Sequence, residues 1–534
     1  MKKTRCICII MAVLLTFGVL SQIASALYPT ASPWPMYRHD LLRSGTCTST
    51  APNTNSTVWT TGTPMSSQPV IVEGMVIYPY GNHLIALNEA TGFTLWTSIA
   101  FDGYAGTPAI SGNVAFVGST GGTLYAVNIN DGSKNWSQTI APGQIQGSPA
   151  VSGRTVYFTT TSNYTYAYDT NGTFLWHYGG LFLAPIYSTP AILGNMLYFG
   201  CDNGQVYALN VSGSLPILKW HFNTHAPTSG NRATPCIANG KVYYGSYGDS
   251  SLYVLNATTG TLLWKWTTTV SGNSGVSSPA YYQTSPHNLI FINGYTSVYA
   301  LYADATPGTN YTENDPAVKY WSSYITYGLT NSPVAADGKV FVTQGSNLYA
   351  LSVTGTGAIT WFYKTTYTLV EPAIADGRLF CGNQAFNIFC FGNYFPALTY
   401  DYTVNVLGNN YVIQLVIANA TPSNQISTAL YAISHQLNYT VQGIDGTNGW
   451  SNVTVPNALL GGPYTVTVDG GGVVQSVVNN GTYSSIYFTY GQSSHQIIIQ
   501  GTTILSEFPT CAVLPLLAGL SLIATVLAKK KQRK

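Results

Sequence analysis

The residues that could perform chemistry are few and widely separated in this sequence of 534 residues. His221 and His225 are four residues apart, but the surrounding sequence is typical of a strand and a loop, where this spacing does not align two metal ligands. The sequence contains no HExxH, P-loop, GxSxG or CxxC motif. Its Asp residues are spread through expected turns, where a carboxylate commonly caps the turn. The chemistry-bearing residues therefore favour binding over catalysis.

The composition restricts the class of protein further. Charged residues make up 7% of the chain and aromatic residues 13%, with 40 Tyr and 53 Gly. This balance excludes intrinsic disorder and helical bundles, because both need many charged residues. Eight of the 20 Lys and Arg residues lie in the first five or the last six positions, so the remaining 12 face 18 acidic residues. A nucleic-acid binder needs a basic surface, so we expect no nucleic-acid partner.

The central part of the chain consists of a repeat of roughly 40 residues. Each repeat begins with a Pro and a short apolar strand, passes through a Gly turn to a strand such as VYFTT, and reaches a third strand such as LYAVN. A fourth strand completes the pattern, and four short strands per repeat of this length predict a β-propeller blade. The eight starting residues are Pro69, Pro108, Pro149, Pro190, Pro235, Pro279, Pro333 and Pro372.

A Trp closes every repeat except the last. The last repeat ends at Phe391 and Gly392 without a Trp, whereas Trp59 precedes the first repeat. We therefore expect the strand around Trp59 to complete the eighth blade and close the ring, which removes free strand edges. The expected structural Trp residues, all on outer strands, are Trp59, Trp96, Trp136, Trp176, Trp220, Trp264, Trp321 and Trp361.

The repeat pattern P-A-[IV]…G…[VL]-Y-[AV]-[LV]-[ND]…T-G…L-W resembles the PQQ-like repeat of quinoprotein-dehydrogenase-like propellers over about 64–393. The preceding segment WPMYRHD, at 34–40, is similar to the leader found before such propellers. The resemblance implies an eight-bladed propeller over 59–395 and a leader at 27–58 that packs against the ring.

The resemblance also implies a cofactor site that can be compared with this sequence. In the quinoprotein dehydrogenases a quinone lies on the ring axis over a Trp, beside two adjacent Cys residues; a Glu, an Asn and an Asp bind calcium, and a further Asp acts as base. This chain has no adjacent Cys pair, and only Glu371, at the start of an inner strand, is expected near the axis. We therefore expect no catalytic residues, no metal ligands, and neither pyrroloquinoline quinone nor calcium. The alternative is a degenerate or atypical quinoprotein-like oxidoreductase.

The variable loops indicate where a ligand would bind. Loops after the second and fourth strands of each repeat vary, and in a propeller they share one face, where binding residues commonly lie. Tyr residues with amide and carboxylate neighbours suit sugars or peptides, although Tyr is common throughout this chain. The expected ligand face comprises Tyr80, His83, Asp102, Tyr104, Asp202, Arg232, Tyr247, Asp249 and Tyr327.

Three of the eight Cys residues lie near the chain ends, and five remain in the body. Cys381 and Cys390 are expected on neighbouring strands of the last repeat, so we predict a hairpin disulfide between them. Cys201 with Cys236 is a second candidate pair. The third alternative is that the body cysteines are small apolar core residues.

Both ends of the chain are typical of targeting segments. Residues 1–26 predict a secretory signal peptide, with an uncleaved anchor as the alternative. Residues 506–534 predict a transmembrane anchor, because 509–528 is uncharged, is long enough to span a bilayer, and precedes five basic residues. This tail resembles the C-terminal sorting tails of archaeal surface proteins, in which the tail can be cut and replaced by a lipid. We therefore expect a single-pass cell-surface protein with an extracellular body.

Residues 398–500 lack the repeat and alternate apolar with polar residues, which predicts a β-sandwich stalk. Eleven Asn-x-Ser/Thr sequences between Asn55 and Asn480 are candidate glycan sites. The expected protein is all-β apart from its anchor helix. We expect a non-catalytic binding or structural module at the cell surface, whose partners are surface proteins or glycans.

Overall fold

The computed structural model describes residues 32–501 apart from several short gaps. The gaps are 141–142, 180–183, 225–231, 269–275, 326–330, 386, 393–397, 407–408, 419, 423–435, 444–447, 458–459, 480–481 and 492–493. The chain divides into two compact units between Tyr394 and Phe395. The expected signal peptide and anchor lie outside the described residues. The described part contains strands and turns and no helix, so no helix there could span a membrane.

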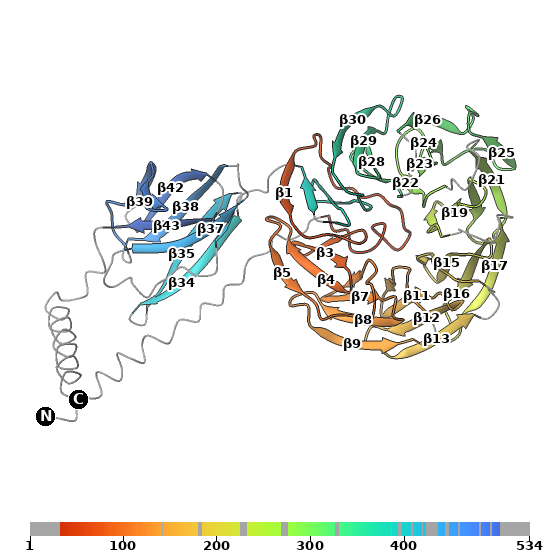
Figure 1. The fold of residues 1–534 in the computed structure, drawn as a ribbon, viewed down its shortest axis with the longest axis horizontal. Helices are drawn as coiled ribbons and strands as arrows, with labels where there is room; N and C mark the ends of the chain where they lie inside the picture. The colour runs from red at the N-terminus through yellow and green to blue at the C-terminus, as the bar shows by residue number, and fades with distance from the viewer. Residues whose placement is uncertain are drawn as a thin grey trace, which may run out of the picture. The chain divides into compact units, whose positions relative to one another are not determined.

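The first unit is a ring of small antiparallel sheets (Figure 1). Within the described residues, eight sheets follow one another along 57–391. The first four contain β2 (Val70–Val72), β3 (Met75–Tyr80), β4 (His83–Asn88) and β5 (Thr94–Thr97); β6 (Ala109–Ser111), β7 (Val114–Gly118), β8 (Thr123–Asn128) and β9 (Lys134–Thr139); β10 (Ala150–Ser152), β11 (Thr155–Thr159), β12 (Tyr164–Asp169) and β13 (Phe174–Gly179); β14 (Ala191–Leu193), β15 (Met196–Cys201), β16 (Gln205–Asn210) and β17 (Ile217–Asn223).

The other four sheets of the ring repeat this arrangement. They contain β18 (Cys236–Ala238), β19 (Lys241–Ser246), β20 (Ser251–Asn256) and β21 (Leu262–Thr267); β22 (Ala280–Tyr282), β23 (Leu289–Asn293), β24 (Ser297–Tyr302) and β26 (Lys319–Tyr324); β27 (Val334–Ala336), β28 (Lys339–Gln344), β29 (Asn347–Ser352) and β30 (Ile359–Lys364); β31 (Ala373–Ala375), β32 (Arg378–Gly382), β33 (Ile388–Phe391) and β1 (Thr57–Thr61). An added strand, β25 (Thr309–Thr312), pairs in parallel with β21 and occupies the long spacing between Pro279 and Pro333.

The short first strands face the axis of the ring. Neighbouring sheets contact one another through these strands, from β31 to β2 and onward to β27. The residues of β2, β27 and β31 are all buried, because sheets crowd together at the axis. The turns that follow the first strands are tight. Glu73 and Gly74, for example, have φ angles of 49° and 71°, which is typical of the primed hairpin turn expected there.

The strand that precedes the first sheet belongs to the last one. β1 pairs antiparallel with β33, and Trp59 lies opposite Cys390. The N-terminal strand is therefore the outer strand of the sheet formed by β31–β33, as the position of Trp59 predicted. This pairing covers the outer edge of β33 with a segment from the other end of the ring.

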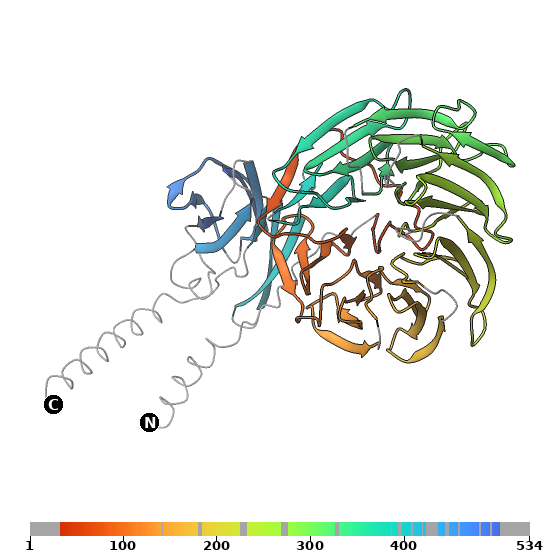
Figure 2. The same ribbon diagram turned by 45° about the vertical axis from the view of Figure 1, so that its right-hand side comes forward.

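The leader runs along the inside of the ring (Figure 2). Its backbone carbonyls, from Trp34 to Gly45, accept hydrogen bonds of 2.7–3.0 Å from six of the innermost strands. The donors are the backbone N–H groups of Ile71, Ile110, Ile192, Ile237, Tyr281 and Ala335. Because one short segment touches six sheets, the leader holds the inner strands together and lies across the axis.

The second unit contains two five-stranded sheets. One is formed by β34 (Leu398–Val406), β35 (Asn409–Ala418), β38 (Asn448–Pro456), β42 (Tyr483–Gly491) and β41 (Gln475–Asn479), and the other by β36 (Ala420–Pro422), β37 (Gln436–Gly443), β43 (Ser494–Gln500), β39 (Thr465–Val468) and β40 (Gly471–Gly472). Alternate residues are buried in both, such as Val453 and Val455 in the first and Ile497 and Ile499 in the second. This alternation is typical of two sheets that share a core.

The predicted disulfide is wrong. Cys381 and Cys390 are both free thiols in the structure. In the β32–β33 pair, Cys390 lies opposite Phe380, whereas Cys381 lies opposite Phe389. Successive residues of a strand point to opposite faces, so the two thiols lie on opposite sides of the sheet. Cys201 and Cys236 are buried and form no disulfide in the described part of the chain, so the interpretation as core residues holds for both pairs.

Candidate binding pocket

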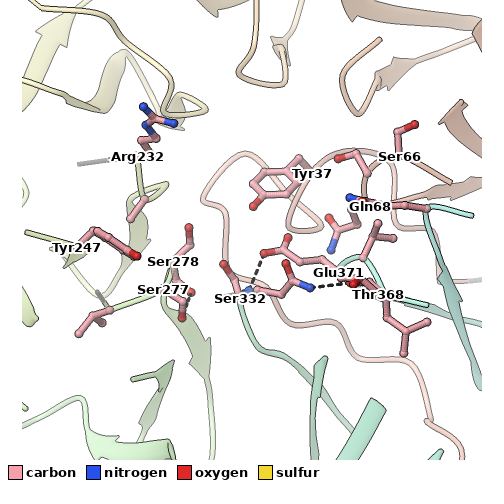
Figure 3. A pocket seen from close by; sticks show the side chains of 17 residues that line it. Tyr37, Ser66, Gln68, Arg232, Tyr247, Ser277, Ser278, Ser332, Thr368 and Glu371 are labelled. Atoms are coloured by element: carbon pink, nitrogen blue, oxygen red, sulfur yellow. Dashed lines mark hydrogen bonds between the residues drawn. The ribbon is translucent and has the colours of Figure 1, made fainter. Parts of the chain in front are cut away.

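A cavity of about 780 Å³ opens among the loops that lead into the innermost strands (Figure 3). This volume is in the range of small-molecule sites. Hydroxyl and amide side chains dominate its lining: Ser66, Ser67, Ser277, Ser278, Ser332, Thr368, Gln68, Asn331 and Gln384. Two aromatic side chains, Tyr37 and Tyr247, and two charged ones, Arg232 and Glu371, complete the polar lining. The cavity therefore offers many hydrogen-bonding groups, together with apolar surface to which Val276, Leu369 and Val370 contribute.

The leader contributes to the floor of this cavity through Tyr37, and two buried arginines fix the leader beneath it. Arg43 donates from Nε to the carbonyl of Pro190 at 2.9 Å and from Nη2 to that of Pro149 at 3.1 Å. Arg38 donates from Nη2 to the carbonyl of Pro279 at 2.6 Å. These prolines begin the innermost strands, so each guanidinium ties the leader to the axis. The planar fork of Arg suits this bridging of carbonyl groups.

Tyr37 and Glu371 are neighbours at the bottom of the cavity. Burial and the negative charge of the nearby Glu371 carboxylate raise the pKa of Tyr37 above its ordinary value. The positive charge of the nearby Arg38 guanidinium lowers the same pKa and so acts against the effect of Glu371. Tyr37 is therefore a neutral hydrogen-bond donor at physiological pH.

A belt of polar residues surrounds the axis at the level of the cavity. One buried residue precedes each starting proline, and we call these eight residues the pre-proline belt: Gln68, Thr107, Ser148, Thr189, Thr234, Ser278, Ser332 and Glu371. Six of them are Ser or Thr. In three places the backbone N–H of one member donates to the side chain of the next: Ser148 to Thr189, Thr234 to Ser278, and Ser332 to Glu371. The belt thus links neighbouring sheets by hydrogen bonds.

Two residues of the expected ligand face line the cavity, Arg232 and Tyr247. The guanidinium of Arg232 lies 4.1 Å from the ring centre of Tyr187, and its Nε lies 3.6 Å from Oδ2 of the buried Asp202. The ion pair with Asp202 therefore helps to position the Arg232 side chain. Tyr327 lies outside the described residues.

The other expected residues in the described part of the chain are not among those that line the cavity. His83 contacts the carbonyl of Ser98 at 3.0 Å, and Asp102 accepts hydrogen bonds from Ser119 and Thr123, so both have structural partners. Asp249 pairs with Lys265 at 2.9 Å. Tyr80 and Tyr104, the remaining two, are exposed, Tyr104 by 70%.

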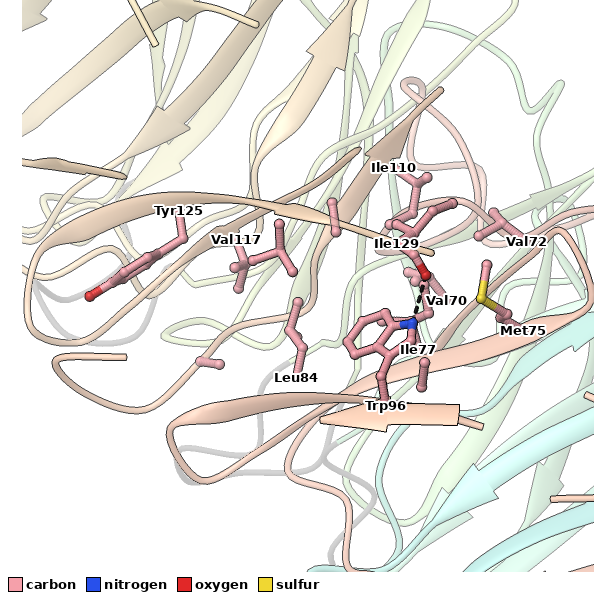
Figure 4. Packing of buried hydrophobic residues seen from close by; sticks show 14 of the residues in the cluster. Val70, Val72, Met75, Ile77, Leu84, Trp96, Ile110, Val117, Tyr125 and Ile129 are labelled. Carbon is pink, nitrogen blue, oxygen red and sulfur yellow. Dashed lines mark hydrogen bonds between the residues drawn. The ribbon is translucent and has the colours of Figure 1, made fainter. Parts of the chain in front are cut away.

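The recurring Trp residues lie between neighbouring sheets, and Figure 4 shows this arrangement for Trp96. Seven of the eight are buried, Trp136 is partly buried, and none is among the residues that line the cavity. The indole N–H of Trp96 donates to the carbonyl of Ile129 in the next sheet at 2.6 Å, and Trp321 bonds Val353 in the same way. The indoles therefore join blades rather than line the axis.

The residues at the axis do not fit a quinone held by calcium. The described residues that line the cavity include no Trp and no Cys, and Glu371 is their one carboxylate. No group of three His, Cys, Asp or Glu side chains in the described part of the chain is placed to hold a metal ion. His221 packs on Tyr207, and His225 lies outside the described residues. A calcium ion needs six or more oxygen ligands, commonly with several carboxylates.

The leader's part in the cavity and most of the lining were not expected from the sequence. Only Glu371 was expected near the axis, and it does line the cavity. A usable signal was present, because a Ser or Thr precedes six of the eight starting prolines, whereas Gln68 and Glu371 depart from that pattern. Tyr37 carried no such signal, since its position depends on how the leader crosses the ring.

Comparisons with known proteins agree with this architecture. The family described as outer membrane protein assembly factor BamB matches residues 80–247 and 194–305. BamB from Moraxella catarrhalis has a TM-score of 0.51 at 17% identity over 63% of this chain and 97% of its own. A europium-containing methanol dehydrogenase has a TM-score of 0.53 at 11% identity, over 68% of this chain and 98% of its own. The computationally designed Ika8 protein has a TM-score of 0.52 at 14% identity, over 62% of this chain and 98% of its own. No curated protein matches the sequence.

The ring of four-stranded sheets and these similarities define a β-propeller. More specifically, the chain is a PQQ-like β-propeller protein. Because the identities to the solved structures are below 25%, the similarity concerns the fold, and function has to be argued from the site.

Proposed function

We propose that this protein is a non-catalytic binding module, in which an eight-bladed propeller presents its loop face to surface proteins or glycans. The observation that carries the proposal is the polar cavity among the variable loops, floored in part by the chain's own leader. Rigid inner strands position these loops, so a ligand would meet a largely preformed site. The compatibility of a BamB-like fold with protein assembly supports a macromolecular partner.

The absence of catalysis is part of the proposal. The cavity offers hydroxyl and amide groups with one carboxylate, which suits hydrogen bonding more than proton transfer or nucleophilic attack. The alternative is an atypical quinoprotein-like oxidoreductase. Incubation of the purified protein with pyrroloquinoline quinone and calcium separates the two, because a bound quinone would add its own absorption band. We expect no such band.

The binding function is tested by probing arrays of glycans and peptides, and extracts of surface proteins, with the purified full-length protein. We expect saturable binding that Arg232→Ala weakens, because Arg232 lines the cavity and its side chain is 61% exposed. Arg154→Ala is the matched control, since Arg154 is exposed and is not among the cavity residues. Failure to bind any of these classes would contradict the proposal.

We further propose that residues 398–500 form a stalk and that 506–534 anchor the body outside the cell. The uncharged stretch 509–528 and the basic residues after it support this arrangement. Deletion of 506–534 should release the body into the medium. A tag after Lys534 should stay protected from protease added to intact cells, or be missing if the tail is cut. Digestion of the tag in intact cells would contradict the arrangement.

A further inference from the structure

Glu371 departs from the chemistry of the pre-proline belt. We call the hydrogen bond from the backbone N–H of one belt member to the side chain of the next the belt bond, and it needs a single acceptor atom. Hydroxyl groups supply this atom in two places: Thr189 Oγ1 accepts from Ser148 at 3.0 Å, and Ser278 Oγ accepts from Thr234 at 2.9 Å. Glu371 supplies the same acceptor with Oε1, which lies 2.7 Å from the backbone nitrogen of Ser332. At positions 189 and 278 a shorter hydroxyl side chain supplies the acceptor. The second oxygen of Glu371, Oε2, has no part in the belt bond.

Tyr37 hydrogen-bonds to the Glu371 carboxylate, yet the second oxygen of this carboxylate, Oε2, is buried and has no hydrogen-bond partner. The residue is 9% exposed, it lines the cavity, and Oε2 has no partner in the structure. A buried carboxylate oxygen without a donor costs free energy, and such groups are rare in folded proteins. Figure 3 shows the Glu371 side chain between Ser332 and Tyr37, within the group of polar residues that line the cavity. This oxygen lacks the donor that a hydroxyl group of a bound molecule would supply.

The charges around Glu371 favour a neutral ligand over a cation. Arg38 is fully buried, and it donates hydrogen bonds to backbone carbonyls, at 2.6 Å for Pro279 and 3.3 Å for Pro333. Its positive charge and the carboxylate of Glu371 both act on Tyr37. A cationic ligand at Oε2 would therefore be repelled by Arg38 as well as attracted by Glu371. A hydroxyl donor carries no net charge, so it keeps the hydrogen bond without that repulsion.

The rest of the cavity suits a molecule that carries many hydroxyl groups. Ser and Thr hydroxyls and amide groups supply both donors and acceptors, as a polyhydroxylated ring requires. Tyr247 is 42% exposed and presents an aromatic ring at the cavity. The leader crosses the axis beneath the cavity, and Tyr37 forms part of the floor. A polymeric ligand could not pass through the ring, because it would collide with the leader. Such a ligand would therefore enter the cavity with one of its ends.

Resting on the proposed function, we propose that the cavity binds the terminal sugar of a glycan end-on. Oε2 of Glu371 accepts hydrogen bonds from the sugar hydroxyls, and the ring of Tyr247 packs against the C–H face of the sugar. Glu371 is thus a ligand-binding residue as well as a member of the pre-proline belt.

The test titrates the purified full-length protein calorimetrically with the methyl glycosides of glucose, galactose, mannose and N-acetylglucosamine, and with a free and an N-acetylated peptide. Glu371→Thr is the informative variant, because it removes Oε2 and carries the hydroxyl group that serves as acceptor at Thr189. Glu73→Gln is the control, since Glu73 is exposed in a hairpin turn away from the cavity. Thermal unfolding of both variants checks that the ring stays intact.

We expect at least one glycoside to bind. Glu371→Thr should weaken it by roughly tenfold to a hundredfold, as expected for the loss of a hydrogen bond to a charged group, with little change in unfolding. Tyr247→Ala should weaken it by several-fold, and Glu73→Gln should leave it unchanged.

Binding of none of the glycosides would overturn the inference. Preference for the free peptide over its acetylated form would overturn it in favour of an ammonium ligand. Glycan or protein binding that Glu371→Thr and Tyr247→Ala both leave intact would also overturn it, while the proposed function would stand. A protein that binds no glycan, peptide or surface protein would instead contradict the proposed function.

Discussion

The indole N–H of Trp59 donates a hydrogen bond to the backbone carbonyl of Glu89 at 2.9 Å. This contact joins the outer strand of the last sheet to the first sheet, because β1 belongs with β33 whereas Glu89 follows β4. Trp96 makes the same contact with Ile129 one sheet further on. The ring is thus closed by the same interaction that joins its consecutive sheets.

Trp59→Ala should lower the free energy of unfolding by about 3–5 kcal/mol, because the indole is 2% exposed and its removal leaves a cavity between two sheets. Chemical denaturation of the full-length protein measures this change. Phe362→Ala is the control: Phe362 is a 56% exposed aromatic residue on an outer strand, and its loss should change stability by less than about 0.5 kcal/mol. Equal stability of the two variants would contradict closure through Trp59.

Gly92→Ala should destabilise the ring more than Gly112→Ala. Both glycines have positive φ, 72° and 54°, so Ala is strained at either position. A Cβ at Gly92 would lie 2.7 Å from Cδ2 of Trp59, whereas one at Gly112 would meet nothing within 4 Å. The difference between the two unfolding free energies isolates the contact with the indole. No difference would show that the indole moves aside without cost.

Arg43→Met should lower stability by about 3 kcal/mol or more, because it leaves buried carbonyls of Pro149, Pro190 and Tyr37 without their donor. Arg43→Lys should be intermediate, since an ammonium group lacks the fork that reaches several carbonyls. Arg154→Met, at an exposed position, is the control. Denaturant titration of the full-length proteins provides the values. A stability equal to that of the control would mean that the leader does not hold the inner strands.

Stability should fall as the pH rises above about 10. Burial raises the pKa of Tyr78 to about 12 and that of Tyr198 to about 12, whereas both ionise near 10 in an unfolded chain. The stability that these groups contribute is fully present below about pH 10 and is lost as the pH rises toward about 12. Unfolding free energies across this window, with the absorbance of tyrosinate as a second signal, test the prediction. Constant stability up to about pH 12 would contradict it.

Much of the ring could be predicted from the sequence because its determinants are local. A Pro, a Gly turn and a Trp recur in each repeat, and each acts within one sheet or between neighbours. The strand around Trp59 was assigned to the last sheet because one repeat lacked its Trp. By contrast, the error over Cys381 and Cys390 arose from register, since a shift of one residue decides which face a side chain occupies.

The cavity could be predicted only in part because several distant segments form it. Of the residues on the variable loops, Arg232 and Tyr247 do line the cavity. Tyr37 arrives there through the leader, whose path is fixed by hydrogen bonds to six strands spread along the chain. No local pattern encodes that path. The departure of Glu371 from the Ser/Thr pattern was visible in the sequence, but its meaning depends on the belt bond to Ser332.

Hydrogen–deuterium exchange of the full-length protein, with and without the ligand that binds most tightly on the arrays, tests most directly whether the loop face is a binding site. The account predicts that ligand slows exchange at 66–68, 276–278, 331–332 and 368–371, the loops that line the cavity. Slower exchange confined to the opposite hairpin turns, such as Glu73–Gly74 and Asp337–Gly338, or to residues 398–500, would contradict it.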